Sequence, residues 1–437
     1  MVTLDASRRV LNTDVLVEGN RIKSVGRSDG RKVGRSKPST TIDCSGLVVL
    51  PGLVQAHIHL CQTLFRGLAD DLSLEAWLAQ RIWPLEAAHT EASLHASAML
   101  GAAELLLGGT TAILDMETVR HTDVAFEALE SIGIRATAGK CLMDSPTSPQ
   151  ALRESTDRAL TESADLCGKW HGAAGGRLRY CFAPRYAPSC TGPLLRAVSD
   201  LAEKSGAVMH THAAETPLEL DTVKRETGHD EIAYLDSVGI SGPRAALAHC
   251  VWVDKDDIAV LARQRTNVVH CPSSNLKLGS GIAPIPEMLA AGCRVGIGAD
   301  GAPCNNRLDA FSEMRLAALI QKPRLGPDAL PAAQALELAT LGGARALGLE
   351  ADIGSIEVGK CADLIVLDLE GPHAQPDDAD LISRIVYSAR AADVRHVIVD
   401  GRVVVRDGDL KTAHLSDIRR RANTEARGLR AKALNRL

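Results

Sequence analysis

The 437-residue chain lacks the features that mark nucleic-acid-binding and membrane proteins. Its net charge is −5 and it has no long basic run, so it offers no electrostatic footprint for nucleic acid. No apolar run reaches the length of roughly 20 residues that a membrane helix needs, and residues 1–9 lack the apolar stretch of a signal peptide. We therefore expect a cytoplasmic protein with no nucleic-acid and no membrane partner.

The chain also lacks a disulfide framework and a zinc finger. Its eleven cysteines never occur with Cys-x-x-Cys spacing and are odd in number, which is typical of small buried residues in a reducing compartment. Tryptophan is scarce, with four in the chain. The length and the 45% hydrophobic content, in contrast, indicate a large core and two domains.

Two histidines one residue apart are the most informative feature that is present. His57 and His59 follow an apolar run that closes with Pro51 and Gly52. In an extended strand, residues i and i+2 share a face, so both imidazoles can hold one metal ion. Taken alone, the pair is equally typical of two ordinary histidines at a strand end.

Four later segments strengthen the metal-site interpretation. Each is a short apolar run that ends in polar residues: Val208–Glu215, Ala245–Cys250, Val268–Pro272 and Val295–Gly301. Helix-length stretches separate them, as expected for the buried parallel strands of βα units. In a (β/α)₈ TIM barrel the catalytic groups lie at the carboxyl ends of the strands and converge on one mouth. The pattern predicts this α/β fold.

The motifs resemble those of the amidohydrolase superfamily, in the branch that holds aminohydrolases of purines, nucleosides and related nitrogen heterocycles. The matching segments are Pro-Gly-Leu-Val-x-x-His-x-His from Pro51, Leu-Phe-Arg-Gly-Leu-Ala-Asp-Asp-Leu from Leu64, His-x-x-Glu from His212, His249-Cys250, His-Cys-Pro-Ser-Ser-Asn-Leu-Lys-Leu from His270 and Gly-Ala-Asp-Gly-Ala from Gly298. The resemblance implies one metal ion per chain, with His57, His59, His212 and Asp300 as ligands. It further implies Glu215 as proton shuttle and His249 beside the bound water.

The chemistry of these residue types agrees with that assignment. Imidazole nitrogen and carboxylate oxygen suit Zn²⁺, with Fe²⁺ as the alternative metal. The metal activates a water molecule, which attacks the ring carbon that bears an amino group. Glu215 carries the water proton to a ring nitrogen, and ammonia leaves. This is hydrolytic deamination of a cyclic amidine.

Three further residues have open roles. His210 alternates with His212 and is a possible ligand on geometry alone, although the His-x-x-Glu motif selects His212. His270 faces either the mouth or the core. Lys140 raises the question of a carbamylated lysine that bridges two metals, but its position in the third strand argues against that role.

The two ends of the chain are expected to form a second, small domain. Residues 1–50 alternate apolar and polar positions in short pieces with turn signals, and the stretches 354–366 and 397–403 do the same. We predict a β-sandwich from residues 1–50 and 349–437 around a barrel at 51–348. Residues 415–437, rich in Arg and Ala, are predicted as a surface or packing helix.

The substrate remains open between several N-heterocycles. The stretch Leu64–Glu86, with Trp77, resembles deaminases of 5′-modified adenosines, whereas Arg185 in Ala183–Cys190 is similar to guanine deaminase. Arginine offers rigid paired donors for a carbonyl oxygen or ring nitrogens. We predict Arg185 and Trp77 as substrate-binding residues, and 5′-modified adenosines slightly ahead of guanine-like bases. Triazine or pterin hydrolysis and a catalytically silent binding protein are the alternatives, and we expect a homo-oligomer.

Overall fold

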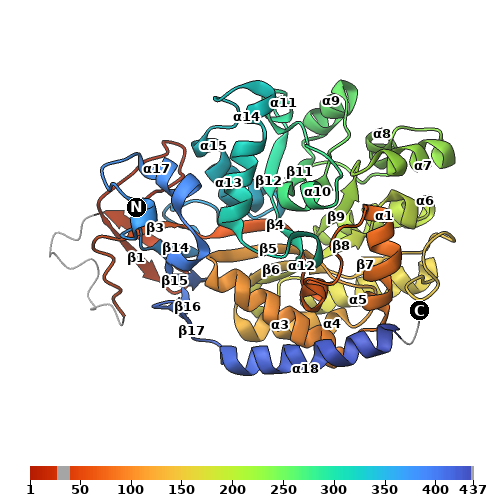
Figure 1. The fold of residues 1–437 in the computed structure, drawn as a ribbon, viewed down its shortest axis with the longest axis horizontal. Coiled ribbons are helices and arrows are strands. Elements are labelled where there is room, and N and C mark those ends of the chain that lie inside the picture. Colours follow the sequence, from red (N-terminus) through yellow and green to blue (C-terminus); the bar gives the residue numbers. More distant parts are fainter. Residues whose placement is uncertain (27–39, 435–437) are drawn as a thin grey trace.

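The computed structural model describes residues 1–26 and 40–434 and has a parallel barrel at its centre (Figure 1). Eight strands follow in chain order and pair in parallel with their neighbours: β4 (Leu53–His59), β5 (Thr110–Met116), β6 (Arg135–Gly139), β8 (Leu178–Pro184), β9 (Val208–Ala213), β10 (Ala245–His249), β11 (Asn267–His270) and β12 (Arg294–Ile297). The short β7 (Cys141–Leu142) pairs with β8. The predicted (β/α)₈ barrel is confirmed.

The last strand closes the barrel through a glycine. β12 pairs with β11, and two residues later β13 (Asp300–Gly301) pairs with β4, so that Asp300 lies beside Ile58. A Cβ atom at Gly298 would lie 2.6 Å from the carbonyl oxygen of His57 and 2.7 Å from its amide nitrogen. Only glycine permits this approach, which brings the eighth strand against the first.

The barrel strands are apolar because both of their faces are covered. Every residue of β4 and of β5 is buried, as expected for parallel strands between a filled interior and an outer helical layer. The main helices of that layer are α3 (Glu91–Leu107), α4 (Thr122–Ile132), α5 (Thr156–Trp170), α6 (Gly192–Ser205), α7 (Pro217–Thr227), α8 (Glu231–Ser237), α9 (Lys255–Gln264), α11 (Ile285–Ala290), α13 (Ala310–Ile320), α15 (Ala332–Glu337) and α16 (Gly343–Ala346).

Helix α6 shows how local sequence sets these boundaries. The Thr191 side chain accepts a hydrogen bond from the Leu194 amide at the start of the helix, and Gly206 ends it with φ +74°, a conformation that favours glycine. Its apolar stripe, Leu194, Leu195, Val198 and Ala202, is buried. Short helices instead surround the barrel mouth: η1 (Leu60–Phe65), α1 (Leu74–Trp77), α2 (Trp83–Ala87), α10 (Pro272–Lys277) and α12 (Ala302–Asn305).

Both ends of the chain build the small antiparallel domain, as predicted. A two-stranded sheet, β1 (Asp14–Glu18) and β2 (Arg21–Gly26), accompanies a five-stranded sheet in the order β17 (Asp409–Leu410), β16 (Arg402–Arg406), β15 (Val394–Val399), β14 (Leu364–Leu367) and β3 (Val48–Pro51). Ile22 of β2 packs with Leu364 and Ile398 of the larger sheet in a shared core.

The C-terminal part of the small domain contains turns and a packing helix. Residues 354–360, in a stretch whose sequence carries turn signals, form turns, with Gly354 and Gly359 at φ +89° and +94°. Helix α18 (Leu415–Leu434) packs on α3 and α2 through Ile418, Ala422 and Leu429, as a packing helix should. Residues 27–39 and 435–437 of the predicted segments lie outside the described residues.

The cysteines agree with a further expectation. All eleven cysteines are free thiols, and ten of them are buried, as predicted for small core residues. Within residues 1–26 and 40–434, every helix is too short or too polar to cross a membrane.

Candidate metal and catalytic site

The four predicted metal ligands meet at the carboxyl ends of three strands. His57 and His59 come from β4, His212 from β9 and Asp300 from β13. The Oδ1 atom of Asp300 lies 3.2 Å from Nε2 of His57 and 3.3 Å from Nε2 of His59. The Nε2 atoms of His59 and His212 are 3.1 Å apart. Three imidazole nitrogens and one carboxylate oxygen therefore face a common point.

Backbone carbonyls fix the tautomers of two of these histidines. The Nδ1 atom of His59 lies 2.8 Å from the Met116 carbonyl oxygen, and that of His212 lies 2.5 Å from the Arg185 carbonyl oxygen. Because a carbonyl only accepts, each Nδ1 carries the proton and donates it. Each Nε2 is left with a lone pair directed at the common point, as a metal-ligating histidine requires.

His57 acquires the same tautomer through His210. The Nδ1 atom of His210 donates to the Ala246 carbonyl oxygen at 2.9 Å, so its Nε2 atom must accept. The Nδ1 atom of His57 lies 2.7 Å from that Nε2 and donates to it. His210 thus orients His57 from behind and keeps the Nε2 lone pair of His57 free, which answers the open question about His210.

Electrostatics keep these groups in the protonation states that a metal needs. Burial, reinforced by neighbouring imidazoles, lowers the pKa of His59 to about 4 and that of His212 well below its usual value. Burial also lowers the pKa of His57. For Asp300 burial works in the opposite direction, but the adjacent His57 and His59 outweigh it and hold its pKa well below the usual range. At neutral pH the cluster presents neutral imidazoles and an ionised carboxylate.

The donor set fits a divalent cation. The buried Nε2 atom of His57 has no hydrogen-bond partner among the described residues, and the facing Nε2 atoms of His59 and His212 are both acceptors. Two lone pairs 3.1 Å apart repel each other unless a cation lies between them. Nitrogen ligands with a single carboxylate suit Zn²⁺ or Fe²⁺ better than Ca²⁺ or Mg²⁺.

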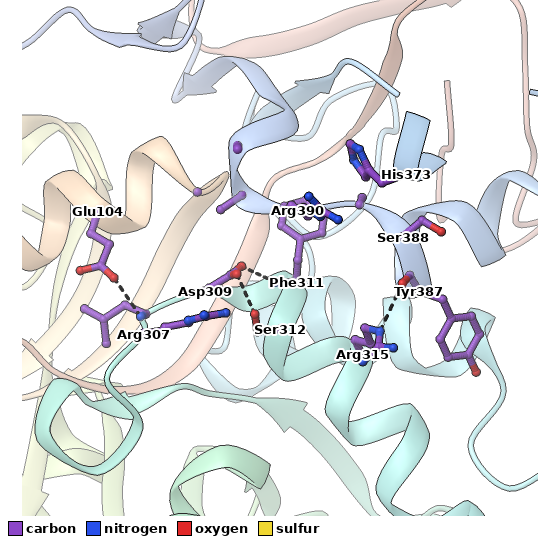
Figure 2. Close-up of a pocket in the computed structure, with 15 residues that line it drawn as sticks. Glu104, Arg307, Asp309, Phe311, Ser312, Arg315, His373, Tyr387, Ser388 and Arg390 are labelled. Atoms are coloured by element: carbon purple, nitrogen blue, oxygen red, sulfur yellow. Dashed lines mark hydrogen bonds between the residues drawn. The ribbon is translucent and has the colours of Figure 1, made fainter. Parts of the chain in front are cut away.

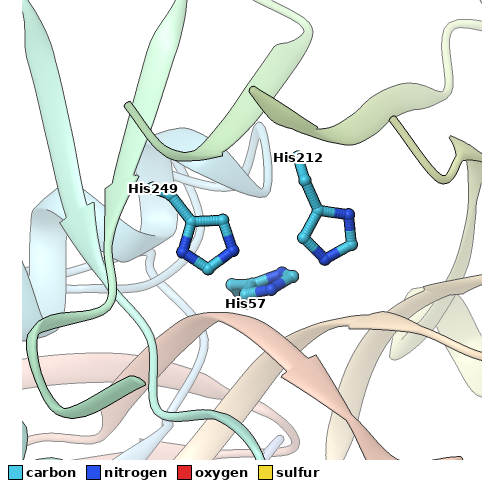
Figure 3. A group of neighbouring side chains, drawn as sticks. All are labelled: His57, His212 and His249. Atoms are coloured by element: carbon cyan, nitrogen blue, oxygen red, sulfur yellow. The ribbon is translucent and has the colours of Figure 1, made fainter. Parts of the chain in front are cut away.

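Glu215 and His249 lie beside this cluster as a facing pair. The Oε2 atom of Glu215 is 3.6 Å from Nε2 of His249. Nδ1 of His249 donates to the Asn275 side-chain oxygen at 2.8 Å, and Ser280 Oγ donates to Glu215 Oε1 at 3.2 Å. The rings of His57, His212 and His249 surround the same space (Figure 3), with centroids 4.9 Å apart for His57–His212 and 5.4 Å for His212–His249.

The pair has unusual proton affinities. Burial raises the pKa of Glu215 to about 7, although His249 works against this rise. Burial alone would lower the pKa of His249, but Glu215 and Asp300 reverse the direction and raise it. A carboxyl with a pKa near neutrality is suited to general acid–base chemistry.

Two buried carboxyl groups fix the backbone that carries Glu215. The Glu215 amide donates to Glu219 Oε2 at 2.7 Å, and the preceding Ala214 amide donates to Glu231 Oε2 at 3.0 Å. Ala214 itself has φ +52°, in the left-handed region that a non-glycine residue rarely adopts. The tight turn after β9 is therefore held from both sides, and it aims Glu215 into the mouth.

A cavity over the cluster is lined in part by the two predicted substrate-binding residues, Trp77 and Arg185. Its walls include Trp77, Arg185, Glu215, His249 and Asp300 together with the apolar Leu74, Leu78 and Leu278. Trp77 lies at the end of helix α1. Its indole is 4% exposed, and its buried Nε1 atom has no partner among the described residues. An aromatic face and a free donor are thus available at the wall.

Arg185 is already engaged by the protein. Its Nη1 atom donates to Glu86 Oε2 at 2.7 Å and its Nη2 atom to Glu86 Oε1 at 3.2 Å, and Gln62 Nε2 donates to the same carboxylate at 2.9 Å. Burial tends to raise the pKa of Glu86, but Arg185 outweighs it and the pKa is lowered. A buried ion pair therefore forms part of the cavity wall.

Sequence reasoning missed the residues that support the site. Ser274, Asn275 and Ser280 bond to Asp300, His249 and Glu215, with Ser274 Oγ donating to Asp300 Oδ2 at 2.6 Å. Ser274 and Asn275 lie in the motif that begins at His270, so this motif could have pointed to them. Glu86 and Gln62 lie near the Leu64–Glu86 stretch, but no spacing rule connects them to Arg185.

Lys140 and His270, whose roles the sequence left open, lie outside the proposed set of metal ligands. Lys140 follows β6, and its Nζ atom lies 2.6 Å from Glu154 and 3.4 Å from Glu162, so its ammonium group is committed to carboxylates away from the cluster. His270 is fully buried, and neither ring nitrogen has a partner among the described residues. Burial lowers the pKa of His270 to about 3, so it is a neutral packed ring.

Known proteins match nearly the whole chain. A model described as the amidohydrolase family matches residues 48–404. A 5-methylthioadenosine/S-adenosylhomocysteine deaminase of Desulforudis audaxviator is 42% identical over 417 residues, which are 95% of this chain and 94% of that protein. A 5′-deoxyadenosine deaminase of Methanothermobacter thermautotrophicus is 41% identical over 398 residues, 91% and 90% of the two chains. The crystal structure of an adenosine deaminase of Xanthomonas campestris with bound zinc has a TM-score of 0.89 at 34% identity, over 95% and 93%.

Proposed function

Because this chain belongs to the amidohydrolase family, we propose that it is a metal-dependent hydrolytic deaminase of purine nucleosides, acting first on adenosines modified at the 5′ position. The observation that carries the proposal is the convergence of His57, His59, His212 and Asp300 next to the Glu215–His249 pair. This arrangement combines a cation site, a group that moves protons and a cavity in one place. A binding protein without catalytic activity has no need for a buried carboxyl whose pKa is shifted to about 7.

We assign His57, His59, His212 and Asp300 as the ligands of one Zn²⁺ per chain, with Fe²⁺ as the alternative. When bound, the dication lowers the pKa of a water molecule and thereby supplies a nucleophile at neutral pH. The zinc in the similar Xanthomonas campestris deaminase supports the choice of metal. The candidate ligand groups among the described residues contain one carboxylate, that of Asp300, which supports a single ion.

Glu215 moves the proton in this scheme. Near neutral pH its ionised and protonated forms are both populated, because its pKa is about 7. The ionised form takes a proton from the attacking water, and the protonated form gives it to a ring nitrogen, which makes the adjacent carbon more electrophilic. A second transfer to the amino group allows ammonia to leave.

His249 stabilises the attacking oxygen. Its Nδ1 proton is committed to Asn275, so only Nε2 faces the reaction. Its raised pKa favours a proton on that nitrogen, and a charged donor stabilises the negative charge that develops on oxygen during attack. Asn275 and Ser280 act as positioning residues for His249 and Glu215.

Arg185 and Trp77 are proposed to bind the purine. Trp77 offers a buried aromatic face, on which a heterocycle can stack. Arg185 stands in the wall with its orientation fixed by Glu86, so it approaches the ring as a rigid donor. We also predict that the protein acts as a homo-oligomer on this small-molecule substrate.

An ammonia-release screen tests the proposal. The zinc-loaded protein is assayed with S-adenosylhomocysteine, methylthioadenosine, 5′-deoxyadenosine, guanine, a pterin and a triazine, and E215Q is the matched control. We expect kcat/KM to be at least ~10-fold higher for the 5′-modified adenosines than for guanine, and kcat to be about 10²–10⁴-fold lower with E215Q. A preference for guanine or triazine would contradict the substrate assignment, and no ammonia from any compound would contradict the activity.

A further inference from the structure

A second cavity lies away from the barrel mouth, between the barrel and the small domain (Figure 2). Its volume is about 690 Å³. The segment Arg307–Arg315, which includes the first turn of α13, forms one wall, and residues 387–392 with His373 form the other. It shares no lining residue with the cavity over the histidine cluster.

Three arginines in this cavity have no acidic partner. Arg307, Arg315 and Arg390 all line it, and none forms an ion pair with a carboxylate within residues 1–26 and 40–434. In the part of the chain that the structure describes, one side-chain bond joins the three to the opposite wall, from Arg315 Nε to the Tyr387 carbonyl oxygen at 3.2 Å. All three arginines are exposed, and Figure 2 shows them among the residues that line the cavity.

The carboxylates of the lining are already committed to other groups. Glu104 accepts from the Leu308 amide at 3.1 Å and pairs with Arg66. Asp309 caps α13, since it accepts from the Phe311 amide at 3.0 Å and from Ser312 Oγ at 2.7 Å. The lining therefore sets three arginines against two carboxylates, which leaves a formal excess of one positive charge.

Neighbouring groups add to the preference for an anion. The eleven-residue helix α13 begins at Ala310, so the positive end of its dipole points toward the cavity. The side chain of His373 on the far wall is fixed by Asp393, with Nε2 to Oδ2 at 2.8 Å. Two lining side chains, Asp309 and His373, are thus ordered by hydrogen bonds of their own.

We propose that this cavity is a binding site for a phosphate-bearing small molecule of nucleotide size. The planar forks of arginine match the oxygens of phosphate in a bidentate manner. Three of them around one space suit a group with more than one negative charge. The volume lies within the range of about 300–1,000 Å³ that small-molecule sites occupy. This site is independent of the proposed deaminase activity.

Calorimetric titration of the zinc-loaded protein with pyrophosphate and with AMP tests the proposal. The test variant is R307Q/R390Q, which leaves the Arg315–Tyr387 bond in place. The matched control is R419Q/R427Q, which removes two exposed arginines of α18. We expect both ligands to bind the wild-type protein and the control alike, and binding to R307Q/R390Q to weaken by at least ~10-fold. If AMP binds more tightly than pyrophosphate, the ligand of this cavity is a nucleotide. If pyrophosphate binds more tightly, the ligand is a polyphosphate.

Three results would overturn the proposal. The first is that neither probe binds at millimolar concentration. The second is equal binding to R307Q/R390Q and the wild type, because the phosphate then occupies another site such as the metal. The third is a dimer that dissociates in R307Q/R390Q while no phosphate binds, because the arginines then face a second copy of this chain. Melting curves of the variants separate loss of a ligand contact from loss of the fold.

Discussion

Replacing Arg185 with Met should weaken both the fold and substrate binding, and the two effects can be separated. In the protein the Arg185 and Glu86 side chains are 5% and 1% exposed and share two hydrogen bonds. Arg185→Met leaves the Glu86 carboxylate buried and unpaired except for Gln62. Breaking a buried pair in this way costs about 3–5 kcal/mol. For a chain of this size that corresponds to a fall in Tm on the order of 5 °C.

The effect on catalysis has a different origin. If the guanidinium contacts the ring, its loss leaves a polar group of the substrate unpaired, and kcat/KM should fall by roughly 10- to 100-fold with the metal content unchanged. The measurements are differential scanning calorimetry, metal analysis and steady-state kinetics with the best substrate of the ammonia screen.

A double variant distinguishes the two roles. Glu86→Gln with Arg185→Met removes both charges, so Tm should recover toward the wild-type value while kcat/KM stays low. An Arg185→Met protein with wild-type Tm would refute the ion-pair argument. Wild-type kcat/KM in a stable Arg185→Met or double variant would refute the substrate contact.

The other predictions concern proton transfer, the metal and pH. Glu215→Gln should retain metal while kcat falls by about 10²–10⁴-fold, and a variant that kept most of its turnover would show that another group moves the proton. The purified protein should hold about one Zn²⁺ or Fe²⁺ per chain, and two tightly held ions would contradict a single site. Chelation and Asp300→Asn should each abolish activity and reduce the metal content. Burial raises the pKa of Glu117 well above its usual value, and the adjacent Asp115 raises it further. The folded protein therefore keeps a proton that the unfolded chain releases, and this contribution to stability is lost as pH rises from about 4.5. Tm should accordingly fall less steeply with pH in Glu117→Gln than in the wild type, and equal slopes would exclude the effect.

The barrel and the position of its polar residues were predictable, because local rules determine both. The period of two along a strand places His57 and His59 on one face, and apolar runs that end in His212, His249 and Asp300 mark the carboxyl ends of parallel strands. The order of those strands around the barrel follows the order in the sequence.

The side-chain partners were not predictable, because they come from segments that meet only in three dimensions. Glu86 reaches Arg185 from a short helix 99 residues earlier in the chain. His210 has the same spacing as a ligand, and its role behind His57 depends on the Ala246 carbonyl group of the next strand.

The closure of the barrel also dictates when the metal site can form. Asp300 belongs to the last strand and His57 to the first, and Gly298 brings them together over 240 residues of intervening chain. On a ribosome, the first histidines leave the tunnel long before Asp300 is made, so a nascent chain holds an incomplete set of ligands. For the proposed ligand set, we therefore expect metal uptake to be a late step that reports a finished barrel. A contact of such long range also carries a high entropic cost before it is formed, which makes closure of the eighth strand the natural slow step of folding.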